Sequence, residues 1–391
     1  MRPRPTAIAS AATGGAHFAA APRSLARIPS ILAALAVSLA LDSQPAAPSD
    51  FRDASTPWRF EFPRDHAAHP GFRTEWWYYT GHLEAEDRKF GFELTFFRVG
   101  LARAGGARAS AWVIRDLIFA HAALTDETGR RFFFADTLVR PALGAAGADS
   151  ARYRVWIDDW SAALASDGKT HRLAADAGRF AFELSLAPGK PPAIHGAGGI
   201  SRKGSDPAMS SHYYSLTRMP ARGRVRLDGE WREVAGEAWM DHEFMTTPER
   251  AVHDGWDWFA LQFEDGRELM LYQLRLPGGK VEPHSSGTWV EADGRTRFLR
   301  RTDFSIEPTG TWRSTASGGR YPSGWRVRVP GESLDVTVTP ALADQELRTR
   351  GIAAVTYWEG SVRVKGTRGG QAAAGRGYVE LTGYSGRPPG Q

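Results

Sequence analysis

The chain has 391 residues and no cysteine, which excludes disulfides, thiolate metal sites, cysteine nucleophiles and a lipidated N-terminal cysteine. Four arginines and one aspartate within residues 1–47 account for +3 of the formal net charge of +5, and the other basic residues alternate with acids, so a nucleic-acid-binding surface is not indicated. The length favours two domains, and the 14 Trp, 20 Phe and 42 Gly favour a β architecture over helical bundles.

Residues 1–47 are predicted to be a secretory signal peptide or a disordered leader. An apolar run from Ile28 to Leu41 follows Arg23 and Arg27, and small residues suitable for cleavage come after it. The run is shorter than the about 20 residues that a transmembrane helix needs. We therefore expect export, to the periplasm or beyond; an Ala-rich leader and a misassigned start codon are the alternatives.

The stretch from Gly71 to Gly100 predicts a long antiparallel hairpin rich in aromatic residues. A strand alternates its side chains between two faces. The first face here carries Thr74, Trp76, Tyr78, Thr80 and His82, and the second carries Glu75, Trp77, Tyr79 and Leu83. Because both faces hold large rings, the rest of the chain must cover both. We expect the run from Trp76 to Tyr79 to form the wall of a ligand pocket.

Further candidate strands recur between Gly-rich loops, and some of them repeat. The hairpin has a counterpart in residues 255–275, and the strand pair within 224–243 resembles the pair within 361–384. This duplication predicts an all-β fold of two units, 51–247 and 248–386. Each unit would most simply close into an antiparallel, lipocalin-like β-barrel, with a β-sandwich as the alternative. The aromatic hairpin would then line a barrel cavity or the contact between the barrels.

The segment GEAWMDHEF, residues 236–244, has the most chemical content. Alternation places Asp241 and Glu243 on one face with Trp239 and places His242 on the other face, so the three polar groups cannot act as a contiguous triad. If the acidic face meets an aromatic pocket, burial would raise the pKa of Asp241 and let it act as a general acid; facing water, the acids would simply be solvated. In the second copy of this strand pair, residues 382–384 take the place of residues 241–243, and none of them is acidic.

Other polar and aromatic residues are candidates for ligand contact. Glu75 and Asp257 lie beside tryptophans, as does Glu359, although an acid there can equally pair with an arginine. The further candidate ligand-binding residues are His212, Tyr213, Trp239, Trp256 and Trp258. The string H-E-x-x-H fails because its fifth position is Thr246, no nucleotide-binding fingerprint is present, and the 11 histidines lack ligand spacing. We therefore predict no metal and no cofactor.

The strings TEWWYYTGHL, GFELTFFR, SHYYS, AWMDHEF, GWDWF, YWEG and GYVELTGY together resemble the AttH-like and carotenoid 1,2-hydratase family, over roughly Trp58 to Tyr384. The resemblance implies two packed lipocalin-like barrels. In the hydratase branch it implies that a carboxylic acid protonates a C=C bond of a polyene and that water captures the carbocation. Asp241 is the inferred acid, with tryptophan faces close to the cation. Other relatives catalyse cycloadditions.

Two functional hypotheses follow. The leading one is an exported lipocalin-like protein that binds an elongated apolar ligand, a lipid or isoprenoid, and serves an envelope ABC transporter as its membrane partner. The alternative is a hydratase of the carotenoid 1,2-hydratase type, a lyase, or a related cyclase, with Asp241 as the acid and with Glu243 and His242 as further catalytic candidates. A purely structural envelope protein without an enclosed cavity is a third possibility.

Overall fold

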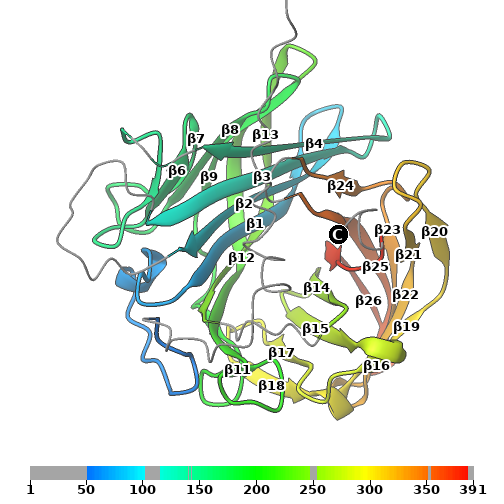
Figure 1. Ribbon diagram of the computed structural model, residues 1–391. Helices are drawn as coiled ribbons and strands as arrows, with labels where there is room; N and C mark the ends of the chain where they lie inside the picture. Colours follow the sequence, from blue (N-terminus) through cyan, green and yellow to red (C-terminus); the bar gives the residue numbers. More distant parts are fainter. Residues whose placement is uncertain are drawn as a thin grey trace, which may run out of the picture.

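The structure, a computed structural model, describes residues 51–101, 115–139, 141, 143–246, 253–350 and 354–385. The expected leader, residues 1–47, lies outside this range. The described residues form strands, turns and short 3-10 helices, so the prediction of an all-β fold is confirmed (Figure 1). Within these ranges no helix has the length and apolar character needed to cross a bilayer. The 3-10 helices are η1 (Arg64–His66), η2 (Pro277–Gly279), η3 (Arg301–Asp303) and η4 (Pro330–Glu332).

The first sheet is antiparallel and has the strand order β4-β3-β2-β1-β13-β12-β9-β8-β7-β6-β5, with β10 and β11 paired to β12. It curls until β3 and β4 contact β6. Its strands are β1 (Thr74–Glu84), β2 (Lys89–Gly100), β3 (Asp116–Asp126), β4 (Arg131–Val139), β5 (Ala146–Ala148), β6 (Arg154–Ile157), β7 (Trp160–Leu164), β8 (His171–Asp176), β9 (Phe180–Leu186), β10 (Ala193–Ile194), β11 (Ser201–Arg202), β12 (Ser210–Leu227) and β13 (Glu230–Met245).

The second sheet follows the first in the chain and has the order β18-β17-β15-β14-β26-β25-β23-β22-β19, with β16 paired to β15 and β24 paired to β25; β20 and β21 form a separate ribbon. Its strands and the ribbon are β14 (Gly255–Phe263), β15 (Glu268–Leu276), β16 (Lys280–Val281), β17 (Ser286–Val290), β18 (Thr296–Arg300), β19 (Ser305–Pro308), β20 (Thr311–Arg313), β21 (Arg320–Pro322), β22 (Trp325–Val329), β23 (Leu334–Pro340), β24 (Glu346–Arg348), β25 (Thr356–Arg368) and β26 (Gln371–Leu381).

The two sheets repeat one topology. The central order β3-β2-β1-β13-β12 of the first sheet matches the order β17-β15-β14-β26-β25 of the second. The two aromatic hairpins, β1-β2 and β14-β15, therefore occupy equivalent places, each beside the last strand of its own unit. The change from one sheet to the other occurs between Met245 and Gly255, the interval that contains the predicted boundary.

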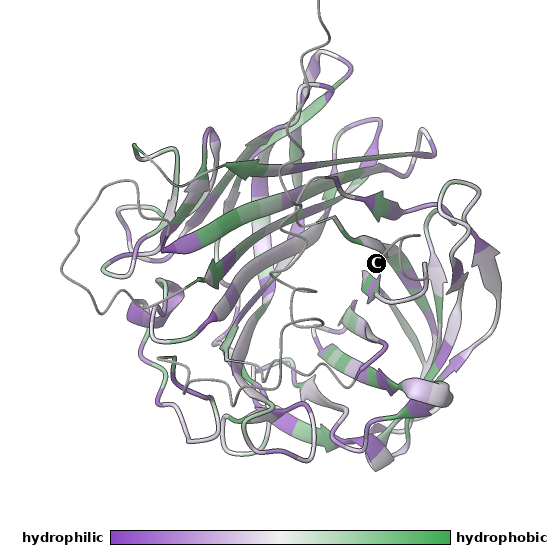
Figure 2. Ribbon diagram, in the orientation of Figure 1, coloured by the Kyte–Doolittle hydropathy of each residue, from purple (hydrophilic) through white to green (hydrophobic). Residues whose placement is uncertain are grey.

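Each curled sheet is filled by its own apolar core. Trp77 and Tyr79 of β1 are fully buried in the first core, and Trp325 and Trp358 are among the largest buried side chains of the second. Full burial of one such side chain contributes roughly 1.5–3 kcal/mol, so these rings stabilise the units strongly. Hydrophobic segments run along β3 and β4 (Figure 2). Side chains thus occupy the barrel interiors where a lipocalin would hold its ligand.

The other face of the first hairpin packs against the second barrel. Tyr78, with Trp76 beside it, joins a cluster that contains Trp239 of the first unit and Trp258 and Tyr378 of the second. The alternation read from the sequence is correct: even-numbered residues of β1 face the contact between the barrels, and odd-numbered residues face the core. The contact between the barrels therefore holds a second, separate cluster of buried aromatic residues, distinct from the two barrel cores.

Candidate functional site

Asp241 lies on β13 at the contact between the barrels, opposite Tyr78 of β1 and Ser215 of β12. Its side chain is 4% exposed. The Trp239 indole N–H donates to Asp241 Oδ1 over 2.6 Å, the Tyr213 hydroxyl donates to Oδ2 over 2.5 Å, and the Ser215 hydroxyl donates to Oδ1. These three donors hold the carboxyl group in one orientation.

The environment of Asp241 gives it the proton affinity of an acid catalyst. Burial raises the pKa of Asp241 to about 7, although the hydrogen bonds from Ser215, Tyr213 and Trp239 lower it. Near neutral pH the group is therefore present in both protonation states, which is the condition that general acid catalysis favours.

The second barrel completes the surroundings of Asp241. Trp258 of β14 donates its indole N–H to the Tyr213 hydroxyl over 3.0 Å. Its ring lies edge to face with Tyr78, with centroids 5.1 Å apart, and with Trp239, with centroids 6.3 Å apart. The site is thus built from both units, and neither barrel forms it alone.

A chain of hydrogen bonds links Asp241 to the second sheet. The Ser215 hydroxyl, which donates to Asp241, lies 2.6 Å from His195 Nε2, and His195 Nδ1 lies 2.7 Å from the Thr288 hydroxyl on β17. Burial lowers the pKa of His195 to about 3, so the imidazole is neutral and can donate at one nitrogen while accepting at the other. Nothing in the sequence pattern marked His195 as part of this site.

The strand register identifies a second acid that is equivalent to Asp241. Asp241 is paired with Tyr78, and Glu380 of β26 is paired with Trp258, which has the position of Tyr78 in the second hairpin. Matching the sequences had placed residues 382–384 opposite the acids of the first unit. That match is wrong by two residues. The pairing of the strands, which comparison of the sequences does not reveal, places Glu380 rather than Thr382 at the position equivalent to Asp241.

Glu380, like Asp241, accepts a hydrogen bond from a tryptophan, but Glu380 is only partly buried and its partner Trp256 is 40% exposed. The Trp256 indole N–H donates to Glu380 Oε2 over 2.9 Å, as Trp239 does to Asp241. Burial is the largest cause that raises the pKa of Glu380 to about 7; the bond from Trp256 opposes it, and the negative charges of Asp241 and Glu243 add to it. The charge of Asp241 thus acts on Glu380 across the contact.

Glu243, two residues beyond Asp241 on the same face, is held as an ion pair. Lys203 Nζ lies 3.0 Å from its carboxylate, and the Ser211 hydroxyl donates to the same group. The ammonium group also lies over the Tyr272 ring, 4.1 Å from the centroid. Although burial opposes its charge, the pKa of Lys203 is raised, chiefly by Glu243. This pairing suits Glu243 to a structural role better than to proton donation.

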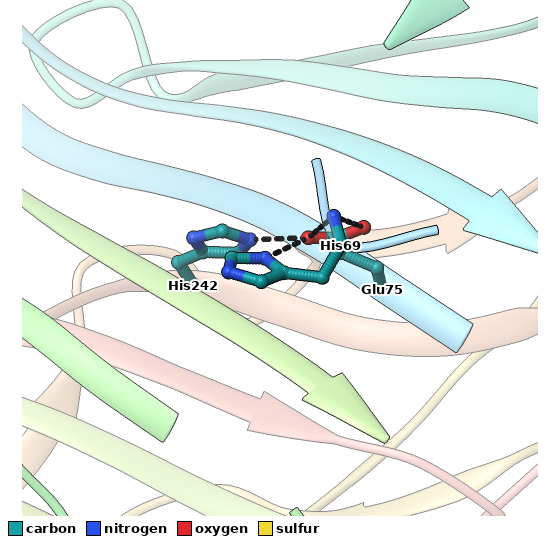
Figure 3. A group of neighbouring side chains, drawn as sticks. All are labelled: His69, Glu75 and His242. Carbon is teal, nitrogen blue, oxygen red and sulfur yellow. Dashed lines mark hydrogen bonds and ion pairs between the residues drawn. The ribbon is translucent and has the colours of Figure 1, made fainter. Parts of the chain in front are cut away.

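Glu75 lies on the core side of β1, in a separate polar group with His69 and His242 (Figure 3), and Arg98 is bonded to the same carboxylate. Glu75 Oε1 is 2.8 Å from His69 Nδ1 and 2.8 Å from His242 Nε2, and Arg98 Nε donates to Oε2 over 3.0 Å. Burial opposes the charge of Glu75, but these histidines and Arg98 lower its pKa well below the usual range. Glu75 is therefore an ionised, paired carboxylate, as the alternative reading of the sequence proposed.

The same group could offer three metal ligand atoms, because His69, Glu75 and His242 bring one each within 4.8 Å of one another. Histidine spacing in the sequence gave no sign of it, since the residues come from distant segments. Each of the three atoms already has a hydrogen-bond partner within the group, and Arg98 supplies a positive charge to the carboxylate. Hydrogen bonds within the group thus engage all three atoms. The absence of a metal stays a prediction.

The predicted ligand-binding residues divide by strand face. Those at the contact between the barrels are Trp76, Tyr78, Tyr213, Trp239, Trp256 and Trp258. Those on the core side are Glu75, Trp77, Tyr79 and His242, together with His212, which lies against Trp58 and Phe244. Asp257, also on a core side, is bonded by Arg275 and Tyr384. Only the first set surrounds Asp241 and Glu380.

A cleft of about 450 Å³ opens at one end of the contact between the barrels. Its polar lining contains His82, Glu84, Lys89, Glu127, Arg218, Glu237, Gln262, Glu264, Arg363 and Arg376. A small cavity of about 10 Å³ shares His82 and Gln262 with the cleft and reaches Trp239 and Tyr378. The cleft itself is lined by neither Trp239 nor Asp241.

Equivalent hydrogen bonds cross the contact beside this cleft. His82 Nε2 lies 3.1 Å from the carbonyl oxygen of Gly377, and Gln262 Nε2 donates to the carbonyl oxygen of Ala238 over 3.1 Å. His82 and Gln262 hold matching positions in the two hairpins, and so do Ala238 and Gly377 in the strands beside them. The two barrels thus meet through nearly the same face, related by a local two-fold axis.

Two curled antiparallel sheets with filled cores and an acidic, aromatic site between them define a two-barrel, lipocalin-like protein. The chain belongs to the AttH-like family, whose model matches residues 53–384, and this confirms the resemblance read from the sequence. A crystal structure assigned as an AttH protein of Nitrosomonas europaea is 34% identical, covers 88% of this chain and 99% of its own, and has a TM-score of 0.75.

A second solved structure, kievitone hydratase from Nectria haematococca, shares the fold at 14% identity with a TM-score of 0.66. The match covers 85% of this chain and 96% of that one. A search of curated proteins found no match.

Proposed function

We propose that this protein is an enzyme that adds water to a C=C bond of an apolar, isoprenoid-like substrate held between the barrels, with Asp241 as the general acid. The observation that carries the proposal is a buried carboxyl group with a pKa of about 7 among tryptophan rings. The family and the shared fold of a protein named as a hydratase support it.

In the proposed reaction, protonated Asp241 transfers its proton to one alkene carbon, and the π electrons form the new C–H bond. The tertiary carbocation left on the other carbon is stabilised by the Asp241 carboxylate that the proton transfer leaves beside it. A water oxygen then forms the C–O bond, and the proton that it loses passes to the ionised Glu380; exchange of protons with solvent then returns Asp241 to its protonated state and Glu380 to its ionised state. Two interacting acids with pKa values of about 7 hold one proton between them at neutral pH, which matches this division of roles.

The carrier hypothesis draws less support from the site. Side chains fill both barrel cores, so neither core offers the internal cavity in which a lipocalin holds its ligand. Export and an ABC transporter partner remain proposals that rest on the leader sequence. Fractionation of the native cells tests export, since recovery of the protein only in the cytoplasmic fraction would reject it.

The hydration proposal is tested by incubating the protein with acyclic carotenoids in H₂¹⁸O and measuring ¹⁸O in the products by mass spectrometry. Asp241→Asn should lower the rate of incorporation at least about 100-fold, because positioned acids contribute about 10²–10⁴-fold. Asp257→Asn is the matched control, since it removes a buried aspartate on the core side of the second barrel. Incorporation by the Asp241 variant at the wild-type rate would remove this residue from the reaction, and no incorporation by the wild-type protein would exclude the substrate class.

A further inference from the structure

His195 lies against both residues whose hydroxyl groups bond Asp241. Its ring packs on the Tyr213 ring with centroids 4.2 Å apart, and its backbone N–H donates to the Tyr213 carbonyl oxygen over 3.0 Å. Its Nε2 lies 2.6 Å from the Ser215 hydroxyl oxygen. His195 directly follows β10 and is fully buried. A buried histidine with these contacts is placed to control where two donors to Asp241 point.

The hydrogen bonds of His195 run in one direction when Asp241 is ionised. A carboxylate has no proton to give, so the Ser215 hydroxyl donates to Asp241 Oδ1. The Ser215 oxygen must then accept from His195, which places the imidazole proton on Nε2. Because burial lowers the pKa of His195 to about 3, the ring is neutral, and its unprotonated Nδ1 accepts from the Thr288 hydroxyl over 2.7 Å. Three donors in series thus point from the second barrel toward Asp241.

Such a series favours the ionised form of Asp241. Hydrogen bonds in a chain polarise one another, so the Ser215 hydroxyl binds the carboxylate more strongly when His195 donates to the Ser215 oxygen. Hydrogen bonds to a charged acceptor are also stronger than those to a neutral one, so the protonated carboxyl group gains less from the same chain. The charged groups that act on Asp241 from the surrounding elements are Glu243, Lys203 and Glu380. His195, being neutral, differs from them in acting through Ser215.

The same contacts suit a nucleophilic Ser215 poorly. In a serine hydrolase the histidine accepts the serine proton, and a carboxylate at its other nitrogen stabilises the imidazolium that forms. Thr288 has that place here and carries no charge. Asp241 lies instead on the far side of Ser215, where it accepts the serine proton itself. A charged His195 would therefore lack the support that the hydrolase histidine has.

We propose that His195 is a positioning residue that acts through Ser215: it aims the Ser215 hydroxyl at Asp241 Oδ1 and so stabilises the carboxylate left when Asp241 gives up its proton. The inference rests on the proposed function only in taking Asp241 as the proton donor. Through Thr288 and His195, the second barrel would set the acidity of a group that belongs to the first.

The test is an NMR titration of Asp241 in protein labelled with ¹³C at the aspartate carboxyl carbon, with the Asp241 signal identified by its loss in Asp241→Asn. We expect His195→Leu to move the titration midpoint of Asp241 upward by about 0.5–1 pH unit, as the loss of one neutral hydrogen bond would. His195→Gln should largely restore the midpoint, because its amide offers both an N–H donor and an oxygen acceptor. In a Ser215→Ala protein, His195→Leu should cause no further change, since its effect passes through Ser215.

His121→Leu is the matched control. It removes another buried, neutral histidine that bonds the second barrel, through Tyr357, and it should leave the midpoint of Asp241 unchanged. An unchanged midpoint in His195→Leu, an equal shift in the Ser215→Ala protein, no recovery in His195→Gln, or the same shift in His121→Leu would each overturn the positioning role.

The tautomer of His195 in the unaltered protein gives a second measurement, which decides the question even where His195→Leu fails to fold. With ¹⁵N-labelled histidine at pH 9, where Asp241 is ionised, Nε2 should give the signal of a protonated nitrogen and Nδ1 that of an unprotonated one; a proton on Nδ1 would overturn the proposal. Neither measurement needs turnover. A failed ¹⁸O assay alongside the expected shifts would therefore reject hydration alone, and ¹⁸O incorporation alongside an unshifted midpoint would reject the positioning role alone.

Discussion

Replacing Asp241 with asparagine should change how the stability of the protein depends on pH. The folded-state pKa of Asp241 is about 7, against an ordinary value of 3.8. Below about pH 4 the group is mostly protonated in both the folded and the unfolded state, so it has little effect on the free energy of unfolding. As the pH rises toward about 7, the unfolded state releases the proton first, so the wild-type protein loses stability across this window.

A rise in pKa from 3.8 to about 7 corresponds to roughly 4 kcal/mol of lost stability once the pH exceeds the folded value. Asparagine does not ionise, so the variant should escape this loss. Its amide oxygen can still accept from Trp239, although it pairs less well with the hydroxyls of Tyr213 and Ser215, which costs about 1 kcal/mol. We therefore expect Asp241→Asn to be more stable than wild type by about 3 kcal/mol at pH 8, and slightly less stable at pH 4.

The measurement is urea unfolding at pH 4, 6 and 8, followed by both tryptophan fluorescence and circular dichroism, because coincident curves test whether unfolding is two-state. Asp257→Asn provides the comparison. The pKa of Asp257 is raised by burial only to about 6, against the charge of Arg275, so its loss of stability should be complete at a lower pH. If the stabilities of wild type and Asp241→Asn depended on pH in the same way, Asp241 would ionise normally, and its raised pKa would be refuted.

Three other expectations can be checked with the same unfolding assay. Glu380→Gln should also raise stability at pH 8, and combining it with Asp241→Asn should give less than the sum of the two effects, because the charge of Asp241 raises the pKa of Glu380; additive effects would show that they do not interact. Arg98→Ala should cost about 3–5 kcal/mol by leaving the Glu75 carboxylate buried with one partner fewer, and a loss below 1 kcal/mol would contradict the pairing. Neither Zn²⁺ nor EDTA should shift the unfolding midpoint; a shift with Zn²⁺ that requires His242 would instead identify the group in Figure 3 as a metal site.

Local sequence pattern was sufficient for much of the fold. The alternation in β1 separated Trp76 and Tyr78 from Trp77 and Tyr79 correctly, because strand geometry alone decides which side chains share a face. The same reasoning placed Asp241 on the face that carries Trp239. The distinctive tryptophan strings led to the family, and the duplication led to two similar sheets.

The rest of the site depends on pairings that no local pattern contains. Glu380 became the counterpart of Asp241 only through strand register, which a shift of two residues in a diverged repeat conceals. His195 joins the site from a segment outside the regular strands, and nothing in its local sequence indicates this contact. Filled barrel cores also could not be foreseen, since whether side chains or a ligand occupy a barrel depends on the summed volumes of its interior residues.

The matching contacts of His82 and Gln262 across the two barrels bear on how such a protein could have arisen. If the chain descends from a single-barrel ancestor, two copies of that ancestor meeting through this face would have presented one acid twice, once from each subunit. Fusion of the two genes would then have freed the paired positions to diverge, one toward Asp241 with its serine neighbour and the other toward Glu380 opposite Glu359. A shared ancestral dimer interface would thus account for a candidate site that belongs to neither half of the chain.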